Sequence, residues 1–129
     1  MNLNHLISKI KSINSNIKFI GQFDHNNKRT GYWEEYYSNG NLRRKGNYIN
    51  GKKDGKWEEY YSNGNLYWKG YYVNCIQEGY WELYYDNGKL LSKGNYINGE
   101  CDGYWEDYNS NGNLIYKGNF INGVFYEIK

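Results

Sequence analysis

Few side chains in the 129-residue sequence can act as nucleophiles, general bases or metal ligands. His5 and His25 are the only histidines, and no Ser/His/Asp or Cys/His arrangement repeats or converges around them. Cys75 and Cys101 fall in loops of successive repeats. Equivalent points there would lie roughly 10 Å apart, too far for a disulfide. We therefore expect two unbridged thiols and no catalytic site.

Carboxylates are numerous, but their pattern indicates structure rather than catalysis or metal binding. Each periodic glutamate has a lysine in register across the expected sheet, and no pocket is expected to perturb its pKa. Asp54 and Asp102 have the chemistry of Ca²⁺ ligands, yet the equivalent residue between them is Glu78 and no EF-hand spacing occurs. Turn polarity accounts for these residues. The sequence therefore predicts no metal and no cofactor.

Charge and hydropathy exclude several classes of function. The net charge is +2, from 16 basic and 14 acidic residues that are mostly interspersed, and the mean hydropathy is −1.03. Nucleic-acid binders usually concentrate basic residues on one face, whereas the only dense run here, Arg43-Arg44-Lys45, occurs in one repeat. No apolar stretch reaches the roughly 18–20 residues that span a bilayer, and no signal-peptide pattern opens the sequence. We expect a cytoplasmic protein that does not bind nucleic acid.

A 24-residue repeat supplies the elements that must position all other side chains. Each unit reads G-x-W-E-x-Y-Y-x-N-G-x-L-x-x-K-G-x-Y-x-N-G, with Asn109 replacing one Tyr and Cys75 replacing one final Gly. Residues 19–23 add an opening strand. The recurring positions are Trp33, Trp57, Trp81 and Trp105; Gly40, Gly64, Gly88 and Gly112; and Gly46, Gly70, Gly94 and Gly118.

The two β-type runs of each unit flank Asn-Gly, which is typical of a two-residue type I′ hairpin turn. A turn at Asn39-Gly40 pairs Tyr37 with Leu42 and brings opposite charges face to face in every unit. It also places each Trp opposite a Gly, so we expect each indole to cover the glycine of its own hairpin. The expected pairs are Glu34–Lys45, Glu58–Lys69, Glu82–Lys93 and Glu106–Lys117, with Trp33–Gly46, Trp57–Gly70, Trp81–Gly94 and Trp105–Gly118.

Alternation along the strands separates two faces of the expected sheet. One carries the tryptophans, glycines, leucines and variable residues and is expected to be packed. The other carries a tyrosine of each unit beside the Glu–Lys pairs and is expected to be solvated. Residues 18–129 should thus form an all-β, elongated, single-layer antiparallel meander of ten strands, about 45 Å long. The tyrosines of the solvated face are Tyr36, Tyr60, Tyr84 and Tyr108.

The first 17 residues have a different pattern. Five apolar residues fall at helical spacing, and Asn2 is suited to cap the N-terminus of a helix. We expect residues 1–17 to form an amphipathic helix and linker that cover the first strand, because the end of a repeat array needs a cap. A membrane-surface anchor is the alternative. The apolar positions are Leu3, Leu6, Ile7, Ile10 and Ile13.

The stretch 45–57, KGNYINGKKDGKW, resembles the MORN repeat (membrane occupation and recognition nexus). The resemblance covers about residues 18–129, and the 24-residue repeat is similar to the variant common in bacterial and large-virus genomes. It implies an elongated, often groove-shaped sheet; some relatives seat a peptide or helix in the groove, and others form dimers. The sequence departs from the family two residues before the strand Gly, where Tyr is preferred. The residues there are Arg44, Trp68, Ser92 and Tyr116.

We expect a non-catalytic scaffold or adaptor whose partner-binding residues lie at variable positions of the packed face. Trp68 is the one tryptophan outside the period, and it should form an exposed apolar spot with Leu83. An alternative is that Trp68 fills a gap between repeats. The candidate residues for contact with a protein or peptide partner are Arg44, Glu59, Trp68, Leu83 and Tyr116.

Two other functions fit parts of the pattern. Peripheral binding to phospholipid is suggested by the family name and a Tyr/Lys-rich face, but each periodic lysine faces a glutamate, which leaves little attraction to anionic lipid. Glycan or choline binding is suggested because the run G-Y-W-E-x-Y-Y resembles secreted wall-binding repeats. That function would require an extracellular setting.

The end of the array predicts self-association. A turn at Asn122-Gly123 places Phe125 opposite Phe120 and adds a short edge strand whose free N–H and C=O groups can template another strand. With the other end capped, we expect a two-fold homodimer. The alternative is that the charges of Glu127 and Lys129 keep the short edge monomeric. Light scattering at micromolar concentration should give twice the 15.4 kDa mass of one chain, and less once residues 124–129 are removed. A monomeric wild-type mass would contradict this. The edge residues are Val124, Phe125, Tyr126 and Ile128.

Overall fold

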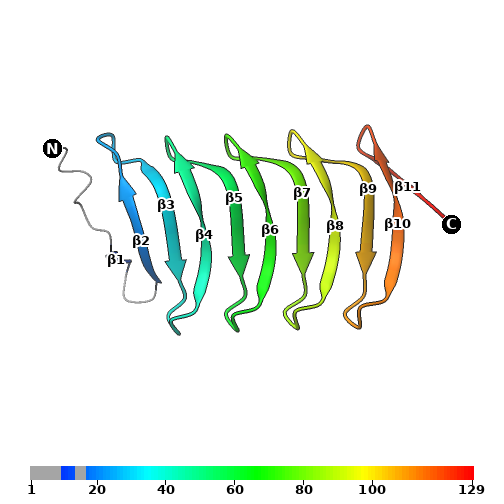
Figure 1. The fold of residues 1–129 in the computed structure, drawn as a ribbon, viewed down its shortest axis with the longest axis horizontal. Helices are drawn as coiled ribbons and strands as arrows, with labels where there is room; N and C mark the ends of the chain where they lie inside the picture. Colours follow the sequence, from blue (N-terminus) through cyan, green and yellow to red (C-terminus); the bar gives the residue numbers. More distant parts are fainter. Residues whose placement is uncertain (1–9, 14–16) are drawn as a thin grey trace.

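The computed structural model describes residues 10–13 and 17–129, which form a single antiparallel sheet. Its eleven strands are arranged in chain order, so each pairs only with its sequence neighbours (Figure 1). The sheet is one layer thick, and β1 and β11 lie at opposite ends. The strands are β1 (Ile10–Ile13), β2 (Ile17–Phe23), β3 (Arg29–Tyr36), β4 (Leu42–Ile49), β5 (Lys52–Tyr60), β6 (Leu66–Val73), β7 (Ile76–Tyr84), β8 (Leu90–Ile97), β9 (Glu100–Tyr108), β10 (Leu114–Ile121) and β11 (Val124–Glu127).

The expected ten-strand meander is present as β2 to β11, and β1 extends it by one strand. Ile10 and Ile13, which were expected on the apolar stripe of a helix, pair in β1 with Ile20 and Ile17 of β2. β-Branched residues favour strands, and the edge of β2 offers unpaired backbone groups to them. The expected helix is therefore wrong for residues 10–13. Its remaining positions in 1–9 and 14–16 lie outside the described residues.

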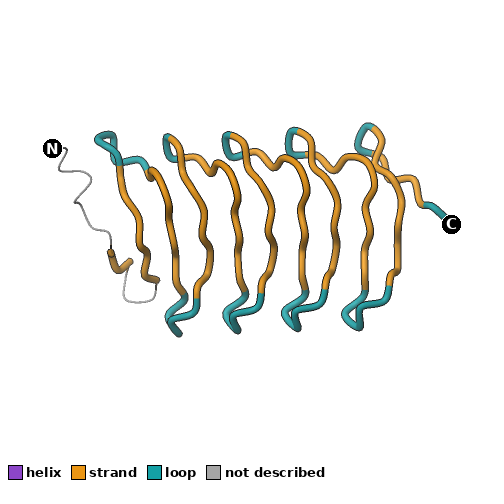
Figure 2. The backbone as a smooth tube through the Cα atoms, viewed as in Figure 1, coloured by secondary structure: helices purple, strands orange, loops and turns teal. Residues whose placement is uncertain are grey.

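The loop between the two strands of each repeat differs from the expected type I′ turn. Tyr37 N donates to Asn41 O at 2.8 Å and Gly40 N donates to Tyr37 O at 2.9 Å, which closes a three-residue loop over residues 38–40. Only Gly40, at φ 91°, is left-handed there, whereas a type I′ turn requires two such residues. The larger loops along one edge of the array are of this kind (Figure 2).

The central register was nevertheless predicted correctly, because a second irregularity compensates for the loop. Glu34–Lys45 and Trp33–Gly46 are partners as expected, but the register shifts after Glu35–Arg44, and Tyr36 rather than Tyr37 pairs with Leu42. The residue left over is Arg43, a β-bulge on β4. The loop is thus one residue longer than expected on the β3 side, the bulge adds one residue on the β4 side, and the two shifts cancel. The equivalent extra residues are Tyr67, Leu91 and Ile115.

Type I′ geometry occurs instead at the turns between repeats. Asn50 and Gly51 have φ values of 53° and 77° and join Ile49 to Lys52, which are partners in the ladder. Cys75 adopts φ 68° in the place of the glycine. The turn predicted at the end of the array is confirmed, with Phe120 opposite Phe125. The other turns of this type are Asn74-Cys75, Asn98-Gly99 and Asn122-Gly123.

Each tryptophan covers the glycine of the preceding repeat, not that of its own hairpin. The partnership of Trp57 with Gly70 is confirmed, but Trp57 is also paired with Gly46 on its other side. A Cβ added at Gly46 would collide with the Trp57 ring, and one at Gly70 with the ring of Trp81. The ladder fixes which backbones are adjacent, while the side chain is free to lean to either neighbour. Trp33 over Gly21 and Trp105 over Gly94 repeat this arrangement.

The indole N–H groups explain the direction in which the rings lean. Between β4 and β5 the register shifts between the pairs Gly46–Trp57 and Asn47–Asp54, which leaves two residues of β5 without a partner in the ladder. Trp57 Nε1 donates to Asn47 O at 3.0 Å, and each ring thus bonds to the carbonyl beside the glycine that it covers. The equivalent bonds are Trp33 to Gln22 O at 3.1 Å, Trp81 to Tyr71 O at 3.3 Å and Trp105 to Asn95 O at 3.0 Å.

The lysine ladder also connects neighbouring repeats. Lys45 lies between Glu34 and Glu58 in the sheet, and its Nζ is 3.7 Å from Glu58 rather than paired with its hairpin partner Glu34. These side chains are partly exposed, so each pair contributes at most about 1 kcal/mol. The equivalent ion pairs are Lys69–Glu82 at 3.1 Å and Lys93–Glu106 at 3.3 Å.

Substitution of Gly70 tests the assignment of its covering ring. We expect Gly70→Ala to destabilise the protein by about 1–3 kcal/mol, because the methyl group displaces the Trp81 ring. Most of that cost should vanish in a Trp81→Leu background and persist in a Trp57→Leu background, as measured by urea unfolding. The reverse dependence would show that the ring of the same hairpin covers the glycine.

Candidate functional site

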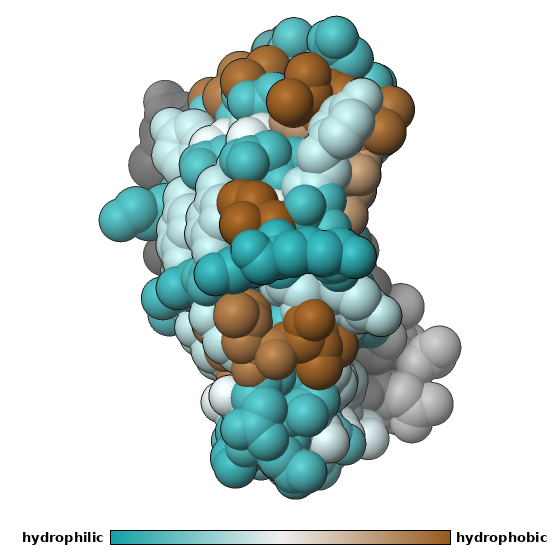
Figure 3. Space-filling view, turned by 90° about the vertical axis from the view of Figure 1, so that its right-hand side faces the viewer, coloured by the Kyte–Doolittle hydropathy of each residue, from teal (hydrophilic) through white to brown (hydrophobic). Residues whose placement is uncertain are grey.

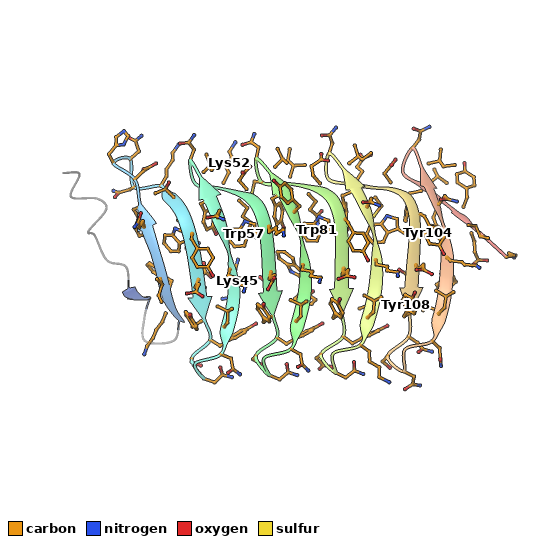
Figure 4. The ribbon with its side chains drawn as sticks, viewed as in Figure 1. Lys45, Lys52, Trp57, Trp81, Tyr104 and Tyr108 are labelled. Carbon is orange, nitrogen blue, oxygen red and sulfur yellow. The ribbon has the colours of Figure 1, made fainter. Side chains whose placement is uncertain are left out.

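The face that carries Trp33, Trp57, Trp81 and Trp105, here the Trp face, carries a row of aromatic rings. Tyr48, Tyr72 and Tyr96 alternate with the tryptophans, and Phe120 follows Trp105. Each lies at a near-perpendicular angle to the tryptophan rings it contacts, a preferred arrangement of ring quadrupoles. The tryptophans lie at the same height in successive repeats, as Trp57 and Trp81 show (Figure 4). The centroid distances are 5.9 Å for Trp33–Tyr48, 4.9 Å for Tyr48–Trp57, 5.1 Å for Tyr72–Trp81, 5.6 Å for Trp81–Tyr96, 5.2 Å for Tyr96–Trp105 and 6.2 Å for Trp105–Phe120.

Beside this row, three columns of the Trp face change residue type from one repeat to the next. They make the N-terminal half of the face charged and the C-terminal half mostly apolar. The columns are Arg44, Trp68, Ser92 and Tyr116; Glu35, Glu59, Leu83 and Asp107; and Arg29, Lys53, Gln77, Cys101 and Phe125.

An ion network occupies the N-terminal half of the face. Arg29 Nη1 lies 2.8 Å from Glu35 Oε1, and Arg44 Nε lies 3.1 Å from Glu35 Oε2. Arg44 also approaches Glu59 at 3.6 Å. Glu35 is only 7% exposed, so its burial depends on these two guanidinium groups. Arg44, a candidate partner-binding residue, is therefore held by Glu35 and by Glu59, which is also a candidate residue.

Trp68 is half-buried rather than the exposed spot expected from the sequence. Its ring lies 4.9 Å from that of Trp81, and its Nε1 donates to Glu59 Oε2 at 3.3 Å. Phe19 occupies the corresponding place at the start of the array, 4.7 Å from Trp33. One edge of Trp68 thus contributes to the packing between repeats, as the alternative interpretation held, and the rest lines the face.

A cavity of about 830 Å³, the groove cavity, opens on the C-terminal half of the Trp face. It brings together Leu83 and Tyr116, two of the candidate partner-binding residues. Leu91 and Ser92 are adjacent in sequence yet both line it, because the bulge at Leu91 interrupts the alternation of the strand. The lining residues are Leu83, Leu91, Ser92, Tyr96, Cys101, Trp105, Asp107, Tyr116, Phe120, Phe125, Glu127 and Lys129.

The middle of the groove cavity carries little charge. Burial raises the pKa of Tyr96 to about 12 and also raises that of the Cys101 thiol, so both groups are uncharged at neutral pH. Cys101 and Cys75 are both unbridged. Asp107 also lines the cavity, and it accepts a hydrogen bond from the buried Ser92 Oγ at 2.5 Å. The cavity is thus suited to apolar groups, with one negative charge at its wall.

Sequence reasoning identified some residues of this face and missed others. It placed the leucine column on this face, but Leu90 is a partner of Tyr84 and lies on the opposite one. It also assigned Phe125 only to the sheet edge, whereas its ring lines the cavity 5.1 Å from Phe120. The column containing Lys53 and Cys101 was missed. Its change of residue type every 24 positions was the signal that could have revealed it.

The opposite face, the Tyr face, holds its charges internally. Tyr80 and Tyr84 both donate to Glu82 at 2.9 Å, and burial together with these bonds raises the pKa of each phenol to about 12. Burial alone would raise the pKa of Glu82, but hydrogen bonds from Tyr84, Tyr80 and Lys69 lower it. Lys45, Lys69 and Lys93 of this face are each paired with a glutamate.

The C-terminal edge is arranged as the sequence predicted. β11 pairs only with β10 among the described strands, and Ile128 N donates to Lys117 O at 2.8 Å. The four expected edge residues are 36–55% exposed. A view of this end shows hydrophobic patches separated by a hydrophilic band (Figure 3). The homodimer itself stays a prediction.

Neither a metal-ligand cluster nor a membrane-spanning helix occurs in the described residues. Within 10–13 and 17–129, no three His, Cys, Asp or Glu side chains come close enough to hold a metal ion. That part of the chain also contains no helix long and apolar enough to cross a membrane.

Together, the single-layer sheet and its repeated Trp face define a β-hairpin repeat protein. A family model for the MORN repeat variant matches four successive segments, residues 29–50, 53–74, 77–98 and 102–122. Together these segments make up more than half of the chain. The chain therefore belongs to the MORN repeat family. The comparison with curated proteins finds no matching sequence.

Trp68 and Tyr116 occupy the same column and differ in burial, which allows a matched test. We expect Trp68→Ala to lower the free energy of unfolding by about 1–3 kcal/mol, because it removes the stack on Trp81. Tyr116, which is 52% exposed, should tolerate alanine within about 0.5 kcal/mol. Urea unfolding of both variants measures this, and equal losses would refute the difference in packing.

Proposed function

We propose that the chain is a non-catalytic adaptor whose Trp face holds a short linear segment of a partner protein. The main observation that supports this proposal is the groove cavity. Its aromatic and aliphatic walls lie open on a protein with a mean hydropathy of −1.03, and its volume is in the range typical of ligand pockets. An apolar side chain of the partner would gain most of its binding free energy from burial there.

The shape of the face favours an extended ligand over a compact one. The cavity is the apolar end of a face that continues across β3 to β11, with the ion network at its other end. Trp, Tyr and Arg, the residue types enriched in binding hot spots, occur together along this face. A linear segment can contact both halves at once, whereas a small molecule would fill only the cavity.

We propose a non-catalytic function because the polar groups of the Trp face bond mainly to each other. Glu35 is held by two guanidinium groups, and Asp107 by Ser92. Lys45, Lys69 and Lys93 of the Tyr face are paired with glutamates, which weakens attraction to anionic lipid on that side. These arrangements favour the Trp face as the binding surface and a peptide as its ligand.

Leu91 and Leu90 give a matched pair of variants, since they are adjacent, similarly exposed and on opposite faces. A displayed peptide library should yield binders of the full chain. Leu91→Glu should weaken the best synthetic binder by about tenfold or more, because it places a charge in the cavity. Leu90→Glu should leave the affinity within about twofold. Fluorescence anisotropy measures both dissociation constants, and circular dichroism checks the fold.

The opposite dependence, with Leu90→Glu harmful and Leu91→Glu neutral, would move the site to the Tyr face and contradict the proposal. The same experiment should include phosphatidylserine vesicles and a cell-wall glycan. Binding to either of these with no peptide selected would replace the proposed function by membrane or glycan recognition.

A further inference from the structure

The ammonium group of Lys53 is surrounded by aromatic rings in the middle of the Trp face. Its Nζ lies 5.1 Å from the ring centroid of Trp57, 5.6 Å from that of Trp68 and 5.1 Å from that of Tyr72. Cation–π contacts of this kind hold a cation in place without neutralising it. Lys53 is therefore a positioned charge rather than a mobile surface lysine.

The carboxylates of the same half of the face are already engaged. Glu35 is bound by Arg29 and Arg44, and Glu59 is approached by Arg44 and by the Trp68 indole N–H. Among the described residues, no carboxylate lies within 4.0 Å of Lys53 Nζ. Three cations thus share two carboxylates, which leaves the N-terminal half of the face with one positive charge in excess.

Burial, and then the nearby charge of Arg44, lower the pKa of Lys53. The charged ammonium is therefore less stable here than in water, and a carboxylate brought by a ligand would stabilise it. The other end of the face has the opposite sign. Asp107 accepts a hydrogen bond from Ser92 but has no cation within 4.0 Å among the described residues. The other two charged residues that line the groove cavity, Glu127 and Lys129, lie 3.9 Å apart and form an ion pair. An anionic group is repelled by Asp107 and attracted to Lys53.

We propose that the partner segment carries an acidic side chain that binds Lys53 while an apolar side chain of the same segment fills the groove cavity. This rests on the proposed function of the Trp face. Lys53 is on β5 and the cavity is centred near β9, four strand spacings or about 19 Å away. An extended segment spans that distance in about six residues and a helical one in about thirteen. The two side chains should therefore recur at one of these spacings.

Peptide selection on matched variants tests the proposal. A displayed library of peptides about 16 residues long covers both spacings. Full-length wild type and Lys52→Glu should select peptides with Asp or Glu at a fixed distance from an apolar anchor. Lys53→Glu should lose that enrichment or select Lys or Arg instead, because the charge has been reversed. Lys52 is the matched control, since it is adjacent to Lys53, exposed, and points away from the Trp face at the rim of the array (Figure 4).

A thermodynamic cycle gives a second readout that tolerates a destabilised variant. The best synthetic peptide and its acid-to-amide analogue are compared on wild type and on Lys53→Met, which retains an apolar stem. The amide should bind wild type about tenfold more weakly and Lys53→Met about equally.

The possible failures can be distinguished. Peptides that depend on Leu91 but show the same acidic preference on Lys53→Glu, or none on wild type, would overturn this inference and leave the groove function standing. Selected peptides that do not depend on Leu91 would overturn both.

Discussion

A sheet of one layer has no second layer to bury its core, and the indole rings of the Trp face replace it. Each ring lies flat on the backbone of a glycine in the preceding repeat and bonds to the adjacent carbonyl, as Trp57 does with Gly46 and Asn47. The four rings are 1–5% exposed, and burial of a ring this size contributes roughly 4–6 kcal/mol before entropy is counted. Because the ring needs the space of a missing Cβ, the glycine is as necessary as the tryptophan.

This contact makes the junction between repeats, rather than the hairpin, the unit of stability. Other side chains act in the same direction: Tyr37 Oη donates to Tyr60 O at 2.6 Å, and Asn39 donates to Ser62 O at 2.8 Å. An array joined in this way gains stability with each junction, and its ends need a substitute for the missing neighbour. At the C-terminal end Gly118 has no following tryptophan, and the ring of Phe125 and the β11 backbone cover it instead.

The sequence predicted the strands, their order and the central register, because the 24-residue period and the Glu–Lys and Trp–Gly pairings all constrain the same alignment. It could not determine which of two flanking strands a side chain contacts. Lys45 has a glutamate on either side, and Trp57 a glycine on either side, so pairing alone is symmetric. The bulge at Arg43 and the longer loop cancelled in the register, which concealed both. The displaced leucine column follows from that irregularity.

The difference between residues that join the repeats and residues that vary from repeat to repeat explains where function can be encoded. The tryptophan, the glycine and the lysine of each repeat are fixed by the junction, and changing any of them damages the scaffold. The three variable columns of the Trp face make no contact that every repeat requires, so they can differ without loss of the sheet. In this chain they place a network of Arg, Lys and Glu over β3 to β6 and an apolar cavity over β7 to β11. A repeat with strict symmetry would present the same chemistry every two strands and bind a ligand in several equivalent registers. The polarity along the columns removes that degeneracy, and a ligand with one charged and one apolar end can then occupy the face in a single position and direction.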